Sequence, residues 1–201
     1  MAAGTSLTEL SQREFLDELD ILLAIYADAM QAQAALLPGR LDLMRRHSSY
    51  PAFRAVHVRA RPGGPVVGFA YGFHGQGGQW WYDAVWAALA RSAGVPAAAD
   101  WLADCMEIAE VHVRTEHQRA GIGSAMLMAL TAGRTERTAV LSTPDRDTTA
   151  RRLYRRVGFG DLLTGFSFPG GSPPYAVMGA VLPLRDPMAA DTGPSSARPS
   201  I

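Results

Sequence analysis

The chain contains no lysine and no asparagine, and it has a single cysteine among its 201 residues. One cysteine, Cys105, excludes an intrachain disulfide and a zinc site built from several cysteines. Every basic residue is therefore an arginine, and the 19 arginines are balanced by 19 acidic residues. A net charge of zero argues against a broad basic surface for nucleic acid or for a membrane.

Long apolar runs and a leader-like N-terminus are also missing. The apolar stretches are far shorter than the roughly 20 residues needed to cross a bilayer. Residues 1–10 contain no basic stretch followed by an apolar core, so they do not resemble a signal peptide. We therefore expect a cytoplasmic protein. With 48% hydrophobic residues, a chain of this length can bury one full core.

Hydrophobic spacing predicts one mixed α/β domain in the order αα-ββ-α-β-α-β-α-ββ. The expected helices are 13–32, 40–47, 79–91, 122–130 and 148–157, with Pro38-Gly39 separating the first two. The expected strands are 53–60, 66–73, 106–113, 138–141, 162–168 and 175–182. We place the domain at residues 1–183. Residues 184–201 lack periodicity and are rich in Pro, Ser and Ala, which predicts a disordered tail.

A strand, a glycine-containing turn and a helix follow one another between Glu107 and Leu130. Gly121 and Gly123 carry no side chain that would keep an anion from the free N–H groups of a first helical turn. The turn predicts phosphate binding, although a tight turn without a ligand has the same pattern. A P-loop is excluded because the chain has no lysine. A dinucleotide fingerprint is excluded because Met126 occupies its third glycine position.

Two motifs resemble those of the GNAT superfamily of N-acetyltransferases. Residues 118–123, QRAGIG, resemble the family pattern Gln/Arg-x-x-Gly-x-Gly/Ala, which binds the pyrophosphate of coenzyme A. Residues 150–159, ARRLYRRVGF, resemble its Ala-x-x-Leu-Tyr-x-x-x-Gly-Phe pattern, in the family order and separation. Residues 111–113 resemble the strand that pairs with pantetheine. The detailed resemblance covers residues 106–160. It implies an α/β fold with a mixed, mostly antiparallel sheet that is flanked by helices and splayed at the cofactor strand.

The resemblance implies an acetyl-CoA-dependent N-acetyltransferase that needs no metal. A primary amine would attack the acetyl group directly, through a tetrahedral intermediate. A non-catalytic acyl-CoA sensor on the same fold is the alternative. The cofactor contacts implied by the family motifs are Val111, His112, Val113, Gln118, Arg119, Ala120, Gly121, Ile122, Gly123, Ser124 and Tyr154.

Asp147 stands where the family often has a cofactor-contacting Asn, and this departure also allows it to be the N-cap of the following helix. Arg151, Arg152, Arg155 and Arg156 form a run that is typical of a solvated helix face with acidic partners. One of these arginines could instead contact the 3′-phosphate of the cofactor.

Acetyl transfer requires a neutral amine, stabilisation of the oxyanion and protonation of the leaving thiolate. By resemblance, Tyr154 lies beside the thioester sulfur, where a phenol can donate a proton. Glu107 and Glu110 are the candidate bases, with His112 and ordered water as alternatives. Strand alternation places the two glutamates on opposite faces unless a bulge shifts the register.

All four tryptophans lie in the segment 75–104. We hypothesise that this segment forms an aromatic wall or lid near the acceptor, with Tyr26, Trp81, Trp86 and Tyr175 lining the cleft. The alternative is a tryptophan stripe that is buried in the core or in a dimer interface. The expected acceptor is a small-molecule amine or a peptide N-terminus. By family analogy, a homodimer is a further expectation.

Overall fold

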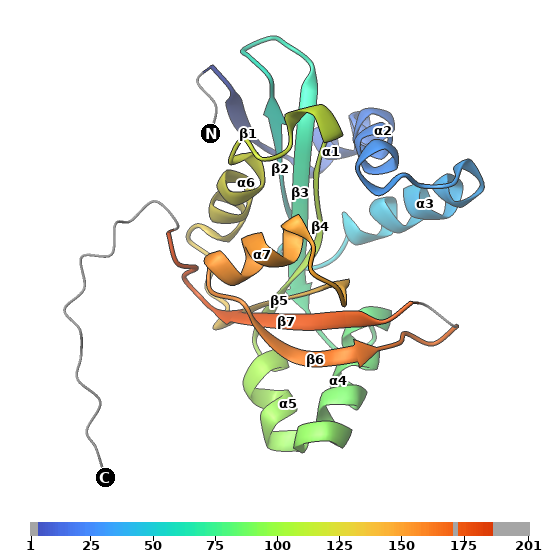
Figure 1. The fold of residues 1–201 in the computed structure, drawn as a ribbon, viewed down its shortest axis with the longest axis vertical. Helices are drawn as coiled ribbons and strands as arrows, with labels where there is room; N and C mark the ends of the chain where they lie inside the picture. Colours follow the sequence, from blue (N-terminus) through green and yellow to red (C-terminus); the bar gives the residue numbers. More distant parts are fainter. Residues whose placement is uncertain (1–3, 171–172, 187–201) are drawn as a thin grey trace, which may run out of the picture.

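The structure is a computed structural model, and it describes residues 4–170 and 173–186. Seven strands form one sheet in the order β1-β2-β3-β4-β5-β7-β6. All neighbouring strands are antiparallel except β4 and β5, which are parallel. Strands β1 to β4 lie side by side, and β5 to β7 cross below them at a steep slant (Figure 1). The strands are β1 Ser6–Leu10, β2 Arg54–Arg59, β3 Val66–Gly75, β4 Cys105–Val113, β5 Thr138–Pro144, β6 Gly160–Phe166 and β7 Tyr175–Val181.

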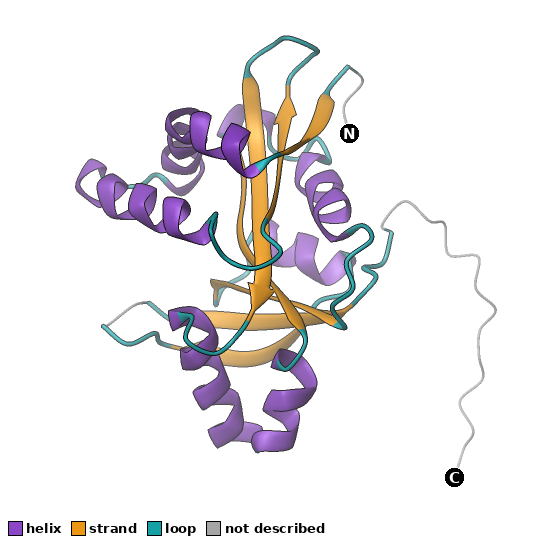
Figure 2. Cartoon of the chain, turned by 180° about the vertical axis from the view of Figure 1, so that it is seen from behind, coloured by secondary structure: helices purple, strands orange, loops and turns teal. Residues whose placement is uncertain are grey.

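Helices cover both faces of this sheet (Figure 2). They are α1 Gln12–Asp17, α2 Leu19–Met30, α3 Leu37–His47, α4 Trp80–Ala93, α5 Val95–Leu102, α6 Ile122–Thr131 and α7 Thr149–Arg156. Two short 3-10 turns, Ala34–Leu36 and Thr115–His117, precede α3 and the loop before α6. The mixed α/β class, the splayed sheet and the flanking helices confirm the fold expected from the sequence.

Three buried clusters hold these layers together. Helices α6 and α7 pack on one face of the sheet through residues such as Met126 and Val157. Helices α1 to α3 cover the opposite face of β1 to β4, where Phe15 and Tyr71 are fully buried. Helices α4 and α5 pack under β5 to β7 around Leu102. A pocket lies where α2, α3 and α4 meet the sheet.

The structure differs from the sequence prediction in four elements. The predicted helix 13–32 is broken at Glu18, which ends α1 and begins α2. The Glu18 carboxylate binds His57 and Arg59 of β2. The spacing of hydrophobic residues does not predict such polar contacts between distant segments, so it does not predict the break. Pro38-Gly39 does not separate helices but lies in the first turn of α3, where proline is tolerated. Strand β1 and helix α5 were not predicted, and α5 also begins with a proline at its first turn.

The packed part of the chain extends beyond residue 183. Leu184 is buried in the cluster under α6 and α7, and the Arg185 N–H donates to the carbonyl of Val157 at 3.0 Å. The rest of the predicted tail, from residue 187 onward, lies outside the described residues. No helix in the described ranges is both long enough and apolar enough to cross a membrane.

A β-bulge in β4 sets the direction of the two candidate bases. Tyr71 pairs with Glu110 but the next residue, Gly72, pairs with Ile108, which leaves Ala109 without a partner in β3. Glu110 therefore lies opposite Tyr71, and Glu107 lies opposite Phe73. Since residues 71 and 73 point to the same face of β3, both glutamates do so too. The prediction from simple alternation, that they point to opposite faces, is wrong.

Gly72 is the residue that makes room for this bulge. A Cβ atom at position 72 would overlap the carbonyl oxygen of Glu107 and would lie 2.8 Å from the Met106 Cε. We expect Gly72→Ala to lower the free energy of unfolding by about 1–3 kcal/mol, the usual cost of overpacking. Urea denaturation of the variant measures this loss.

Gly77→Ala is the matched control, because a Cβ there has no atom within 4 Å. An unchanged stability of Gly72→Ala, with Gly77→Ala also unchanged, would contradict the proposed steric role of Gly72.

Candidate active site

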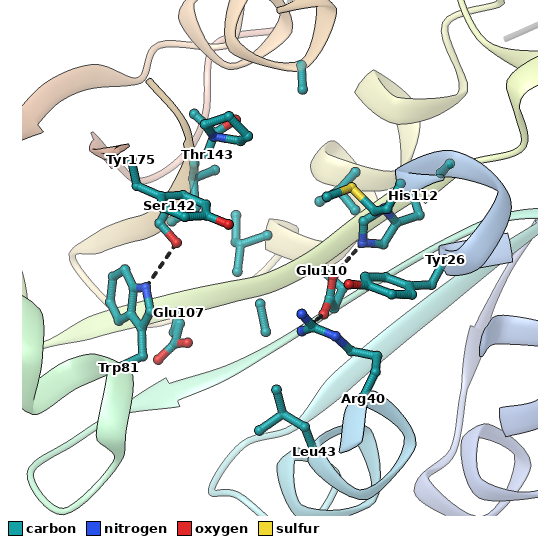
Figure 3. Close-up of a pocket in the computed structure, with 18 of the residues that line it drawn as sticks. Tyr26, Arg40, Leu43, Trp81, Glu107, Glu110, His112, Ser142, Thr143 and Tyr175 are labelled. Atoms are coloured by element: carbon teal, nitrogen blue, oxygen red, sulfur yellow. Dashed lines mark hydrogen bonds and ion pairs between the residues drawn. The ribbon is translucent and has the colours of Figure 1, made fainter. Parts of the chain in front are cut away.

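A pocket of about 850 Å³ opens between α2, α3, α4 and the sheet. Glu107 and Glu110 of β4 lie on its floor, between Trp81 and Tyr175 on one side and Tyr26 and Arg40 on the other (Figure 3). It forms because β4 and β5 pair only at Cys105, Met106 and Glu107 and separate beyond that point. The two carboxylates thus lie where the sheet opens.

Glu107 is buried without a counter-ion. The residue is 5% exposed, and its Oε2 atom has no hydrogen-bond partner among the described residues. Burial raises the pKa of this carboxyl to about 8, because an isolated carboxylate is poorly solvated there. The group is thus a weak acid whose conjugate base titrates close to neutral pH.

Glu110 has the opposite environment although it is equally buried. Burial by itself would raise the pKa of Glu110, but His112 and the Arg40 guanidinium more than offset this and lower it. Arg40 Nη1 donates to Oε1 at 2.6 Å, and the His112 imidazole pairs with Oε2. The Arg40 guanidinium also lies 4.6 Å above the Tyr26 ring. Glu110 is therefore an ionised, fully engaged carboxylate.

Tyr154 lines the same pocket from α7 and is 7% exposed. Burial, together with the negative charge of Glu110, raises the pKa of its phenol above the ordinary value. Its ring packs at 5.9 Å from that of Phe159. The hydroxyl consequently stays protonated at neutral pH and can act as a hydrogen-bond donor.

The first turn of α6 presents unoccupied backbone donors. Gly121 precedes the helix with φ of 77°, and no side chain caps the helix there. Arg119 also has a positive φ, 64°, which is uncommon for a residue with a side chain. At Gly123 a Cβ would lie 3.0 Å from Leu153 of α7, so only glycine fits without displacement. This arrangement suits a diphosphate, which the helix dipole attracts.

Strand β4 offers further backbone groups beside this turn. The Arg114 N–H donates to the Val67 carbonyl at 2.8 Å, so alternation turns the backbone groups of Val111 and Val113 away from β3, toward the opening. The Gln118 side chain, which lines the pocket, donates to the Val113 carbonyl at 3.1 Å. The His112 side chain instead points toward α2, with its ring 5.1 Å from that of Tyr26.

Comparison with known proteins identifies the family to which this arrangement belongs. A family model described as an acetyltransferase (GNAT) domain matches residues 56–160. A GCN5-like protein acetyltransferase of Mycobacterium tuberculosis is 35% identical over 188 residues, covering 81% of this chain and 90% of that protein. This chain belongs to the GNAT acetyltransferases.

Solved structures show the same fold. The ribosomal-protein-S18-alanine N-acetyltransferase of Escherichia coli has a TM-score of 0.59 at 14% identity, over 88% of this chain and 93% of that one. The PaiA N-acetyltransferase of Thermoplasma acidophilum, solved in complex with coenzyme A, has a TM-score of 0.57 at 11% identity, over 89% of this chain and 99% of that one.

Membership of the GNAT family identifies the chain as an acetyl-CoA-dependent acyltransferase. The residues present fit this cosubstrate. The glycine-containing start of α6 lies next to the part of β4 that does not pair with β5. Ile122, Gly123 and Ser124 begin α6, and Ala120 precedes its N-cap, so the predicted cofactor contacts from 118 to 124 lie in one turn. When bound, acetyl-CoA supplies the activated acetyl thioester.

Asp147 neither caps α7 nor lines the pocket in this structure. The N-cap of α7 is Thr148, whose hydroxyl accepts from the Arg151 N–H at 3.0 Å, so the prediction that Asp147 caps the helix is wrong. Asp147 is exposed and pairs with Arg152 at 2.6 Å. It does not line the pocket.

The arginine run of α7 is used largely for ion pairs. Arg151 is buried and bridges Asp145 and Asp161 at 2.5 and 3.0 Å. Arg155 also pairs with Asp161, at 2.9 Å. These pairs attach α7 to β6 and to the loop after β5, and thereby fix the position of Tyr154.

The four tryptophans have different surroundings. Trp81 lines the pocket and its indole N–H donates to the Ser142 hydroxyl at 3.1 Å. Trp80 lies on the pocket rim, 59% exposed, with its ring 5.2 Å from that of Phe168. Trp86 stacks on Tyr82 in the cluster under β5 to β7 and does not line the pocket. Trp101 packs against Gly179, where no Cβ would fit.

Sequence reasoning missed the contribution of α3. Arg40, Leu43, Arg46 and His47 line the pocket at helical spacing, and the His47 imidazole lies 3.1 Å from the Tyr71 hydroxyl. The only available signal was a polar stripe on a short helix, which is also typical of a solvated face. Only the tertiary structure brings α3 close to β4.

The two glutamates should contribute to stability with opposite pH dependence. The folded pKa of Glu107, about 8, exceeds the ordinary carboxyl value of 4.5, so its contribution to stability falls as pH rises from about 4.5 to about 8. The pKa of Glu110 is lowered, so its contribution is present above the unfolded value and is lost as pH falls through the folded one. We expect Glu107→Gln to gain stability relative to wild type between pH 5 and pH 8.5.

Glu110→Gln is the comparison variant, and we expect it to be less stable than wild type by a constant margin from pH 5 to pH 8.5, a margin that shrinks only as pH falls below about 4.5. Chemical denaturation at several pH values measures both differences. A Glu107→Gln variant whose stability relative to wild type does not change with pH would show that this carboxyl is not perturbed in the folded protein.

Proposed function

We propose that this protein transfers the acetyl group of acetyl-CoA to a primary amine, with Glu107 as the general base and Tyr154 as the proton donor to the leaving sulfur. The observation that carries the proposal is the buried, unpartnered Glu107 carboxyl in the pocket where β4 and β5 separate. Glu107 Oε2 has no competing partner among the described residues, so it is available to accept a proton from an amine or from a bridging water.

Of the two candidate bases, Glu107 and Glu110, we propose Glu107 and not Glu110. Both of its oxygens are already engaged, by Arg40 and by His112, and its pKa is lowered. A weaker base with occupied lone pairs is a poor proton acceptor. The negative charge of Glu110 adds to the effect of burial in raising the pKa of the Tyr154 phenol.

Backbone groups complete the arrangement. The open amide groups of Val111 and Val113 would hold the cosubstrate along β4, and the first turn of α6 would bind its diphosphate. Tyr154 would then lie at the inner end of the cosubstrate, close to Glu110. Binding in this way positions a thioester and an amine without a covalent enzyme intermediate.

The acceptor amine that we propose belongs to a peptide or protein. The name of the M. tuberculosis relative, a protein acetyltransferase, supports this choice. The aromatic and basic side chains of the pocket rim, Trp80 and Arg46, are exposed, so they can contact a segment larger than the amine itself. A small-molecule amine remains the other class to include in the assay.

Thiol release from acetyl-CoA tests the proposed function directly. The assay uses the full chain with a panel of lysine peptides, peptides with free N-termini and small amines. Amine-dependent thiol release supports an acetyltransferase. Saturable acetyl-CoA binding with no release for any amine would overturn it in favour of a sensor.

Replacement of the phenol is expected to slow turnover. Tyr154→Phe removes the proton donor but keeps the ring that packs against Phe159, so kcat should fall by roughly 10²–10⁴-fold with little change in acetyl-CoA affinity. Tyr82→Phe is the control, because Tyr82 packs against Trp86 away from the pocket. Wild-type turnover of Tyr154→Phe would remove the phenol from the mechanism.

The pH dependence of the rate should reveal Glu107. With a lysine acceptor, whose amine pKa is near ~10.4, both the base and the amine must lose a proton. The slope of log(kcat/KM) against pH should therefore fall from about 2 to about 1 as pH passes the Glu107 pKa of about 8. In Glu107→Gln the slope should be about 1 throughout, at a lower rate. A break near pH 8 that persists in this variant would assign it to another group.

A further inference from the structure

Two arginines that line the pocket, Arg46 and Arg146, pair with no acidic side chain in the described part of the chain, and Arg46 is the one carried by α3. Arg46 lines the pocket from α3 and is exposed. In the described part of the chain no acidic side chain pairs with it, whereas its neighbour Arg45 pairs with Asp42 at 3.4 Å. The two adjacent arginines thus differ. Arg45 forms an ion pair outside the pocket, whereas Arg46 lines the pocket.

The charges of the pocket do not cancel. The Glu110 carboxylate is neutralised by Arg40, and Glu107, with a pKa of about 8, is mostly uncharged at neutral pH. His47 is neutral as well, because burial lowers its pKa to about 4 despite the attraction of Glu110, with Arg40 and Arg46 adding to the lowering. The α3 wall therefore retains a positive charge at Arg46.

The opposite wall of the pocket is aromatic. Trp80 and Phe168 pack against each other at 5.2 Å and line the pocket, and Tyr175 lies 5.4 Å from Phe168. An acceptor that fills the pocket thus meets a carboxyl on the floor, rings on one side and an arginine on the other. An acceptor that carries only positive charge would be repelled by this last group.

We infer that the acceptor is a peptide segment that carries a carboxylate side chain next to its reactive amine, and that Arg46 binds this carboxylate. The inference rests on the proposed acetyl transfer and names its substrate class. The planar guanidinium can pair with a carboxylate through two parallel hydrogen bonds, which fixes orientation as well as charge. Arg46 is then a specificity-determining residue that acts while the amine lies at Glu107.

Matched peptides test this inference. Two blocked peptides, each presenting one lysine, differ only in having Glu or Gln beside that lysine, and a second pair presents a free N-terminus in the same two contexts. We expect wild type to favour the Glu peptide in kcat/KM by about 5-fold, the scale of one well-placed but water-exposed ion pair. The preference should shrink at high salt because the charges are screened.

Variants of α3 then assign the preference to one side chain. Arg46→Gln should bring the ratio between the Glu and Gln peptides close to one, and Arg46→Glu should invert it. Arg45→Gln, which changes the neighbouring arginine that faces away from the pocket, should keep the wild-type ratio. A thermal melt of each variant checks that the fold is intact.

The outcomes separate the two levels of the argument. Thiol release with small amines but with no peptide overturns the acceptor class and leaves the acetyltransferase. Equal rates with the Glu and Gln peptides, or a Glu preference that survives in Arg46→Gln, overturn the role of Arg46. A preference for a phosphorylated serine over Glu beside the lysine would retain Arg46 as the anion site but replace the carboxylate by a phosphate. Absence of thiol release with every amine overturns both proposals.

Discussion

The bulge at Ala109 controls the chemistry of the pocket because it decides where two carboxylates point. Without the extra residue, Glu107 and Glu110 would lie on opposite faces of β4, and one of them would enter the apolar cluster under α6. With it, both face α2 and α3. The bulge in turn depends on Gly72 of the neighbouring strand, since a side chain there would collide with the Glu107 backbone. A single missing Cβ on β3 therefore sets the geometry of the site.

Once both carboxylates share a face, their different partners divide the roles. Two like charges in one buried pocket would destabilise each other and the fold. The structure avoids this by giving Glu110 an arginine and a histidine and by leaving Glu107 with no counter-ion. The Glu110 carboxylate therefore stays charged, and the Glu107 carboxyl titrates near pH 8. The raised pKa of Glu107 thus follows from its burial, whereas Arg40 on α3 helps to lower the pKa of Glu110.

Contacts outside the pocket connect its parts. Asp28 of α2 accepts the Thr115 N–H at 2.7 Å, so the helix that carries Tyr26 is attached to the loop that leads into α6. At the other end of α6, the Arg54 guanidinium of β2 donates to the Ala132 carbonyl at 2.5 Å. Helix α2 is therefore attached to the loop after β4, and the end of α6 is attached to β2.

The sequence by itself determined the family, the mixed α/β class and the turn at Gly121, because these depend on local periodicity and on two short motifs that are read directly from adjacent residues. It also named Glu107, Glu110 and Tyr154 as candidates, which the structure brings into one pocket, but it left open which carboxylate has no partner among the described residues. That distinction, the contribution of Arg40 and Arg46, the break at Glu18 and the presence of α5 were decided only by the tertiary structure. The reason is that the pKa of a buried carboxyl depends on partners such as Arg40, which is 70 residues away in the chain, and no local pattern encodes such a distance.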